Sequence, residues 1–194
     1  MKEKYVDTHL VDEAIKFAVE AHAGTERRGK GFPYIIHPLE AMAIVATITT
    51  DPELLAAAAL HDVVEDTNFT AEDIRARFGD RVAHIVSGES DAVIEGASLE
   101  DSWQARKQMA LDHLKAADTD TKIVAMGDKL SNMRAIARDY REIGDDLWER
   151  FHSKDRKLHE WRYRGLADAL KDLEGTEAYR EFVALVNEIF DEEK

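Results

Sequence analysis

Cysteine is absent from this chain of 194 residues. Its absence excludes disulfide bonds, thiolate nucleophiles, zinc–thiolate sites and iron–sulfur clusters together. Any metal ion that the protein binds must therefore be held by nitrogen and oxygen ligands.

Proline and long apolar runs are also scarce. The chain has three prolines, and its longest apolar stretches are much shorter than the roughly 20 residues that span a bilayer. The N-terminal sequence MKEKYVDTHLVDE lacks the apolar segment of a secretory signal. We therefore expect a cytoplasmic protein without a membrane partner. With 44% apolar residues and no low-complexity tract, we expect one domain over residues 1–194.

Positive charge is in the minority, with 26 Lys and Arg against 40 Asp and Glu and a formal net charge of −14. This charge repels the backbone of DNA and RNA, so we expect no nucleic-acid partner. It would also repel a phosphorylated small molecule. An anionic substrate would need a local group of cations or a bound metal ion. The sequence gives no prediction of the oligomeric state.

Apolar residues recur at intervals of three and four almost throughout, and no alternating strand pattern of useful length is present. This periodicity predicts an all-α fold, a single-domain helical bundle. Asp51 followed by Pro52 is a helix start, and TAED (70–73) and SLED (98–101) are capping boxes. Residues 87–98 are expected to form a polar loop. Further helices are expected over about 8–23, from Pro38, and over 121–140, 156–173 and 176–192.

The segment AAAALHDVVEDT (56–67) carries four polar side chains in an apolar run. If the helix continues through it, His61, Asp62, Glu65 and Asp66 form one broad polar patch. Burying even one unpaired carboxylate costs several kcal/mol. The patch must therefore face solvent, pair with cations or bind a metal. An ordinary solvated face fits poorly with the surrounding Ala, Leu and Val.

Matching groups occur in two other segments. PYIIHPLEA carries His37 at a helix start, and MGDKLSNMR carries Asp128 and Asn132 on one helix face. A divalent ion would find four ligands and a balancing charge in His37, His61, Asp62 and Asp128. Open coordination positions would then admit water and substrate. Glu65 and Asp66, one turn away, are suited to accept a proton from a metal-bound water or to orient it.

Three stretches together, HAGTERRGKGFPYIIHPLEA, AALHDVVEDTNFTAEDIRARFGDRVAHIV and GDKLSNMRAI, resemble the HD phosphohydrolase superfamily. More narrowly, they resemble the hydrolase domain of the RelA/SpoT homologues, which degrade the alarmone (p)ppGpp. The resemblance covers about residues 22–140 by motif. It implies an all-helical HD-type fold and one metal ion, usually Mn²⁺, at His37, His61, Asp62 and Asp128.

The resemblance also implies roles for five further residues. Glu65 and Asp66 match the pair that activates the water attacking the 3′-pyrophosphate. Arg27 and Arg28 match a basic pair that contacts the nucleotide, and Asn132 matches a residue near the ribose and phosphates. The implied activity is that of a guanosine-3′,5′-bis(diphosphate) 3′-diphosphatase, which releases pyrophosphate from (p)ppGpp. Because the chain has no room for a synthetase domain, we expect a small stand-alone hydrolase.

Three positions depart from the family pattern. Ala125 stands where a lysine is frequent, Ala135 where a threonine is common, and Ser131 where a histidine usually precedes the asparagine. These departures keep open hydrolysis of another phosphorylated nucleotide, such as NADPH or ppApp. A nucleotide-binding regulator without turnover is a further alternative. Arg162 and Arg164 either add positive charge near a phosphate or form ion pairs on a helix surface.

Overall fold

The computed structural model describes residues 7–88 and 103–191, which form helices and one isolated β-bridge between Glu26 and Pro33. The all-α prediction is confirmed. The helices are α1 (His9–Ala21), α2 (Ile36–Val45), α3 (Pro52–Leu60), α4 (Val63–Asp66), α5 (Ala71–Phe78), α6 (Asp80–Gly88), α7 (Trp103–Ala116), α8 (Thr119–Ile143), η1 (Gly144–Arg150), α9 (Arg156–Ala169), η2 (Lys171–Leu173) and α10 (Glu177–Phe190). Within the described residues, no helix combines the length and apolar character needed to cross a membrane.

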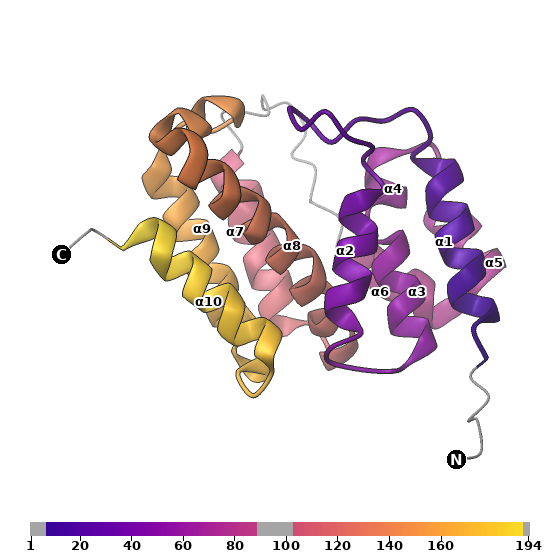
Figure 1. The fold of residues 1–194 in the computed structure, drawn as a ribbon. Coiled ribbons are helices and arrows are strands. Elements are labelled where there is room, and N and C mark those ends of the chain that lie inside the picture. Colours follow the sequence, from indigo (N-terminus) through magenta and orange to yellow (C-terminus); the bar gives the residue numbers. More distant parts are fainter. Residues whose placement is uncertain (1–6, 89–102, 192–194) are drawn as a thin grey trace, which may run out of the picture.

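Helices α2 and α8 lie side by side in the middle of the molecule (Figure 1). On one side, α1 and α3 to α6 enclose an apolar core that includes Leu54 and Ile85. On the other side, α7, α9 and α10 enclose a second core that includes Met133 and Phe182. Both central helices contribute to both cores, so their side chains meet where the two cores adjoin.

Gly127 allows α2 and α8 to approach closely. A Cβ atom at this position would lie 2.6 Å from the carbonyl oxygen of Ala41 and 2.7 Å from Cγ2 of Val45. Any side chain would therefore push the two helices apart. This contact involves the residue immediately before Asp128 and a residue one turn after His37, so it sets the separation of two expected metal ligands.

Two predicted helix starts are present. The Asp51 side chain accepts a hydrogen bond from the backbone N–H of Glu53, with Pro52 in the first helical position. Thr70 and Asp73 form the reciprocal capping box at the start of α5. The expected capping box at 98–101 and positions 89–98 of the expected loop lie outside the described residues, while residues 87 and 88 belong to α6.

The expected continuous helix through AAAALHDVVEDT is wrong at its centre. Helix α3 ends at Leu60, residues 61 and 62 form a turn, and α4 begins at Val63. His61 Nδ1 lies 2.9 Å from the carbonyl oxygen of Ala58, so the imidazole satisfies a carbonyl near the end of α3. Because the apolar periodicity continues across the turn, it does not indicate that the helix ends there. Helix α2 also begins two residues before Pro38.

Candidate metal centre and adjoining cavity

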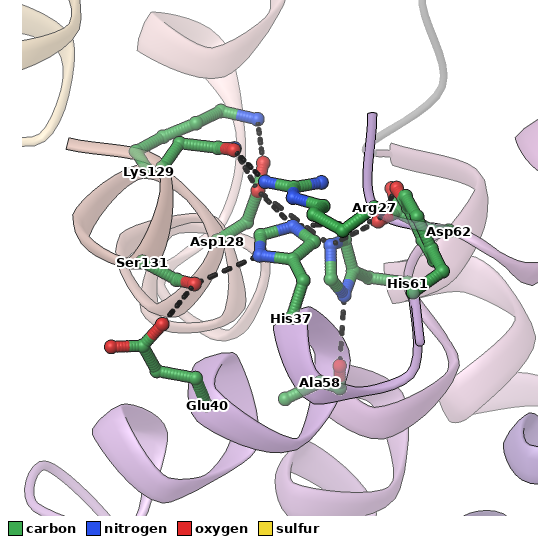
Figure 2. Close-up of polar contacts among 11 residues, drawn as sticks. Arg27, His37, Glu40, Ala58, His61, Asp62, Asp128, Lys129 and Ser131 are labelled. Carbon is green, nitrogen blue, oxygen red and sulfur yellow. Dashed lines mark hydrogen bonds and ion pairs between the residues drawn. The ribbon is translucent and has the colours of Figure 1, made fainter. Parts of the chain in front are cut away.

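The four expected metal ligands converge from three segments (Figure 2). His37 lies in the first turn of α2, His61 and Asp62 lie in the turn between α3 and α4, and Asp128 lies within α8. His37 Nε2 is 3.1 Å from Asp128 Oδ1 and 3.4 Å from Asp62 Oδ2. His61 Nε2 is 3.0 Å from Asp62 Oδ2 and 3.6 Å from Asp128 Oδ1. Two imidazole nitrogens and two carboxylate oxygens thus face one point.

Both imidazole rings present Nε2 to this point because Nδ1 is engaged elsewhere. His61 Nδ1–H donates to the Ala58 carbonyl, and His37 Nδ1 contacts Ser131 Oγ at 2.8 Å. His61 Nε2 is buried and has no partner with hydrogen-bond geometry in the described part of the chain, despite its approach to Asp62. A buried unpaired nitrogen is costly, and a cation would satisfy it.

The donor set fits a divalent ion. Ligand atoms of His37, His61 and Asp128 lie within 4.8 Å of one another, and Asp62 adds a second carboxylate to the same group. Imidazole and carboxylate ligands suit first-row metals such as Mn²⁺ and Fe²⁺ as well as Zn²⁺. The chemistry of these side chains therefore supports a divalent metal without selecting one.

The four groups also shift one another's pKa values. Burial alone would lower the pKa of His61, but the Asp62 and Asp128 carboxylates outweigh it and raise that pKa well above its usual value. Burial would raise the pKa of Asp62, but the charge of the His61 imidazole, whose Nε2 lies 3.0 Å from Asp62 Oδ2, lowers it. For Asp128, burial is likewise outweighed by Lys129, His37 and His61, and its pKa falls well below the ordinary range. Both carboxylates therefore remain ionised, as metal ligands must.

Tyr34 links this group to the expected catalytic pair. Its hydroxyl donates to Asp62 Oδ2 at 2.7 Å, and burial together with the nearby Asp62 and Asp66 carboxylates raises its pKa. The phenol therefore stays protonated and can act as a donor. Glu65 and Asp66 are both exposed, and Glu65 lines the cavity at the four expected ligands. His22 is buried with its ring 4.9 Å from that of Tyr34, so it supports the site from behind.

A cavity of about 120 Å³ opens at the four ligands, and its walls carry several cations. Among them is Arg27, whose guanidinium donates to Asn132 Oδ1 at 2.5 Å; Asn132 Nδ2 in turn donates to Asp128 Oδ1 at 2.5 Å. The expected substrate residues Arg27 and Asn132 are thus connected to an expected metal ligand. The other cations that line this cavity are Lys107, Lys129 and Arg162.

A second cavity of about 320 Å³ adjoins the first and shares Arg27, Tyr34, Asn132 and Arg162 with it. Arg28, the other expected nucleotide-binding arginine, lines only this larger space. Its walls combine cations with apolar surface. The further cations are Lys30 and Arg150, and the apolar part includes Ile136, Leu147, Phe151 and Tyr163.

Several lining residues were not predicted as site residues. Lys107 and Arg150 lie in segments with no recognisable motif, whereas Lys129 directly follows Asp128 and its Nζ lies 2.5 Å from Asp128 Oδ2. The structure separates the two arginines of the WRYRG segment. Arg162 lines both cavities, and Arg164 forms surface ion pairs with Glu160 and Asp191.

The departures from the family pattern fall at different places. Ala135 lines the larger cavity, so the threonine that is common there would change its wall. Ala125 is completely buried in the core and lines none of the cavities described above. This departure therefore has no counterpart in the walls of either cavity. Ser131 is buried against His37.

Residues 14–154 match the family model of the HD domain. The chain belongs to the HD domain family. It is 34% identical over 169 residues to the guanosine-3′,5′-bis(diphosphate) 3′-pyrophosphohydrolase of Aquifex aeolicus, covering 80% of this chain and 24% of that protein. The chain thus spans about a quarter of the length of this relative.

Shorter relatives align over most of both chains. The MESH1 protein of Xenopus tropicalis, also named a guanosine-3′,5′-bis(diphosphate) 3′-pyrophosphohydrolase, is 32% identical, with 90% of each chain covered. A solved structure described as a metazoan ortholog of SpoT that hydrolyzes ppGpp superimposes with a TM-score of 0.70 at 24% identity. That superposition covers 96% of this chain and 97% of the other, and it establishes the shared fold.

Proposed function

We propose that this HD domain protein is a metal-dependent hydrolase that releases pyrophosphate from the 3′ position of guanosine-3′,5′-bis(diphosphate), (p)ppGpp. The observation that carries the proposal is the convergence of two imidazoles and two carboxylates beside a cation-lined cavity in a protein of net charge −14. The names of the Aquifex and Xenopus relatives point to the same substrate.

In this proposal His37, His61, Asp62 and Asp128 hold one divalent ion, with Mn²⁺ as the proposed metal. A bound divalent ion supplies Lewis-acid polarisation of a phosphoryl oxygen. Glu65, on the cavity wall, takes the proton of the attacking water, and Asp66 assists it from the adjacent position. The water oxygen attacks the phosphorus that is bonded to the 3′ oxygen. The bond between that phosphorus and the 3′ oxygen then breaks, and the proton that Glu65 took from the water passes to the 3′ oxygen, which leaves as a hydroxyl.

The cations of the two cavities bind the phosphates. Lys107 and Arg162 line the smaller cavity, where they stabilise the negative charge of the pyrophosphoryl group under attack and of the 3′ oxygen that leaves it. Arg27 and Asn132 lie between the two cavities and hold the part of the nucleotide that spans them, and Arg28 adds charge to the larger one. The apolar wall around Leu147, Phe151 and Tyr163 suits a nucleoside base.

Purified protein incubated with Mn²⁺ and ppGpp tests the proposal directly, with the products separated by anion exchange. We expect pyrophosphate and GDP in equal amounts, and no products from His61→Ala or Asp62→Ala. If metal-loaded protein leaves ppGpp intact, this substrate assignment is wrong.

A second candidate is hydrolysis of another phosphorylated nucleotide, such as ppApp or NADPH. The presence of Ala135 in the larger cavity, where the resembled family commonly has threonine, favours keeping it. The same assay with these nucleotides separates the two candidates. Binding of ppGpp without product from any nucleotide would instead indicate a regulator. The single-domain organisation and the cytoplasmic location stay predictions.

A further inference from the structure

A chain of hydrogen bonds leads away from His37 on the side opposite the expected metal (Figure 2). His37 Nδ1 lies 2.8 Å from Ser131 Oγ, and Ser131 Oγ donates to Glu40 Oε2 at 2.8 Å. The other carboxylate oxygen of Glu40 accepts from Arg134 at 3.3 Å. Two bonds of 2.6 and 2.7 Å from Arg134 to Glu181 on α10 hold that arginine.

The protons in this chain have only one consistent arrangement. An ionised carboxylate accepts hydrogen bonds but cannot donate them, and a serine hydroxyl has a single proton. Because Ser131 gives that proton to Glu40, its oxygen can only accept from His37. His37 must therefore carry a proton on Nδ1. In the neutral ring this leaves the lone pair on Nε2, the nitrogen that faces Asp128 and Asp62.

We propose that Ser131 and Glu40 are positioning residues that fix the tautomer and orientation of His37 for metal binding. This proposal rests on the metal site of the proposed function. It assigns part of the metal affinity to Ser131 and Glu40, which are not themselves ligands. Ligating histidines generally donate their second N–H to an oxygen acceptor, which makes them better ligands and fixes the ring plane.

The positions of these residues on α2 and α8 support the positioning role. Glu40 lies three residues after His37 on α2, and Ser131 lies three residues after Asp128 on α8, so each pair shares a helix face. His37 on α2 is oriented by Ser131 on α8, and Ser131 is oriented by Glu40 back on α2. Ser131 is 2% exposed, so water does not compete for its hydroxyl. The Gly127 contact keeps the two helices close enough for these bonds.

The other imidazole provides an internal comparison. His61 Nδ1 donates to the Ala58 carbonyl, a backbone group that no side-chain substitution removes. Only His37 depends on side chains for its tautomer. Removing the Ser131 hydroxyl should therefore weaken one ligand of four and leave the rest of the metal site intact.

The experiment measures Mn²⁺ affinity without substrate, by competition with a chelating indicator. We expect Ser131→Ala to bind Mn²⁺ about 10- to 100-fold more weakly than the unmodified protein, and Glu40→Ala to weaken it in the same direction. Ser131→Thr retains the hydroxyl and should restore most of the affinity. Ser87→Ala is the matched control, because the Ser87 hydroxyl donates to the Ala83 carbonyl within α6.

A second measurement reports the tautomer itself. Nitrogen-15 NMR of labelled histidine side chains distinguishes a protonated Nδ1 from a protonated Nε2, and a His37→Asn variant assigns the signals. In metal-free protein at alkaline pH, we expect His37 to carry its proton on Nδ1, and Ser131→Ala to move it toward Nε2. A change of folding stability alone would not produce this shift.

The outcomes separate this inference from the proposed function. Unchanged Mn²⁺ affinity and an unchanged His37 tautomer in Ser131→Ala would overturn the positioning role. The same conclusion follows if Ser131→Thr binds metal as poorly as Ser131→Ala, because packing would then explain both. If the unmodified protein binds Mn²⁺ but cleaves no ppGpp, the function fails while the positioning role stands. If the unmodified protein binds no Mn²⁺, the positioning role in metal binding is overturned together with the proposed metal site.

Discussion

The two adjoining cavities differ in how their walls are assembled. Around the smaller one, the four expected ligands come from three short motifs, and each motif is recognisable in the sequence. The larger one combines Arg28 and Lys30 from a loop with Arg150 from η1 and Tyr163 from α9. Arg28 and Lys30 belong to the first of these motifs, but Arg150 and Tyr163 belong to none of them. The expected metal binding thus depends on short contiguous patterns, whereas the proposed nucleotide binding also depends on how distant segments pack.

The charged groups are also held differently. In the smaller cavity, histidines and carboxylates stabilise one another at the expected metal position. In the larger cavity, Asp139 contacts both Lys30 and Arg150, joining the loop, α8 and η1. Loss of the metal should therefore impair the function of the first cavity. Mutations that disturb packing or charge should impair substrate binding in the second. The following predictions test this difference, from the largest expected effect to the smallest.

Removal of a ligand should have the largest effect. We expect Asp128→Ala to lose stoichiometric Mn²⁺ and to slow pyrophosphate release by about 10³-fold or more, since a metal ion supplies several kcal/mol of stabilisation to such a reaction. Metal analysis and a product assay check this. His84→Ala is a control at an exposed histidine that pairs with Asp118. Normal activity in Asp128→Ala would show that the smaller cavity is not the catalytic centre.

Removal of the proposed base should separate catalysis from metal binding. We expect Glu65→Gln to lower kcat by about 10²-fold, because a positioned general base contributes at least that much, while Mn²⁺ affinity changes little. Steady-state kinetics and the indicator assay measure the two quantities. Glu72→Gln, on the exposed surface of α5, is the matched control. Equal loss of metal and activity in Glu65→Gln would place Glu65 among the ligands instead.

Two arginines only two residues apart test the cation assignment. We expect Arg162→Gln to raise KM for ppGpp by about 10-fold, the equivalent of one lost charge-assisted hydrogen bond. Arg164→Gln removes a guanidinium from the same helix without touching either cavity, so its KM should be unchanged. If the two variants had equal effects on KM, α9 would act only through its overall positive charge and not through a contact of Arg162 with the substrate.

Overpacking between α2 and α8 should lower both the stability of the protein and its metal affinity. Gly127→Ala places a Cβ against the Ala41 carbonyl, and overpacking of this kind costs about 1–3 kcal/mol of unfolding free energy. The same displacement should weaken Mn²⁺ binding, because α2 and α8 each carry ligands. Denaturant unfolding and metal titration check both. Gly175→Ala, where a Cβ meets no atom within 4 Å, is the control.

The smallest expected effect is a pH dependence of metal-free stability. Above about pH 6.5, His61 loses its proton in the unfolded chain but keeps it in the folded protein, whose His61 pKa is raised. The free energy of unfolding should therefore fall as pH rises through that folded pKa. Asp62 and Asp128, whose pKa values are lowered, stabilise the fold above about pH 4, and this stabilisation is lost at lower pH.

Bound metal should reverse the alkaline part of this profile, because it requires the deprotonated imidazole. Denaturant unfolding at several pH values, with Mn²⁺ and with a chelator, measures the difference. A metal-free protein whose stability is constant from pH 6 to 9 would contradict the raised pKa of His61.

Much of the helical framework was predictable because its signals are local. Apolar periodicity, the Asp51 cap and the Thr70 capping box depend on residues within a few positions of one another. The break at His61 was not predictable in this way. There, an imidazole that satisfies an α3 carbonyl ends the helix, although the apolar pattern continues to Val63.

The sequence by itself determined the all-α class and the residues that meet at the expected metal position, since ligand chemistry requires these residue types whatever surrounds them. Only the tertiary structure decided that Lys107 and Arg162 line the same cavity, that Arg150 lines the adjoining one, and that Arg164 lines neither. It also placed the Ser131 hydroxyl 2.8 Å from His37 Nδ1. The reason is physical: a cation or a hydroxyl gains its role from the groups that packing brings within a few ångströms, and distant segments carry no record of that proximity.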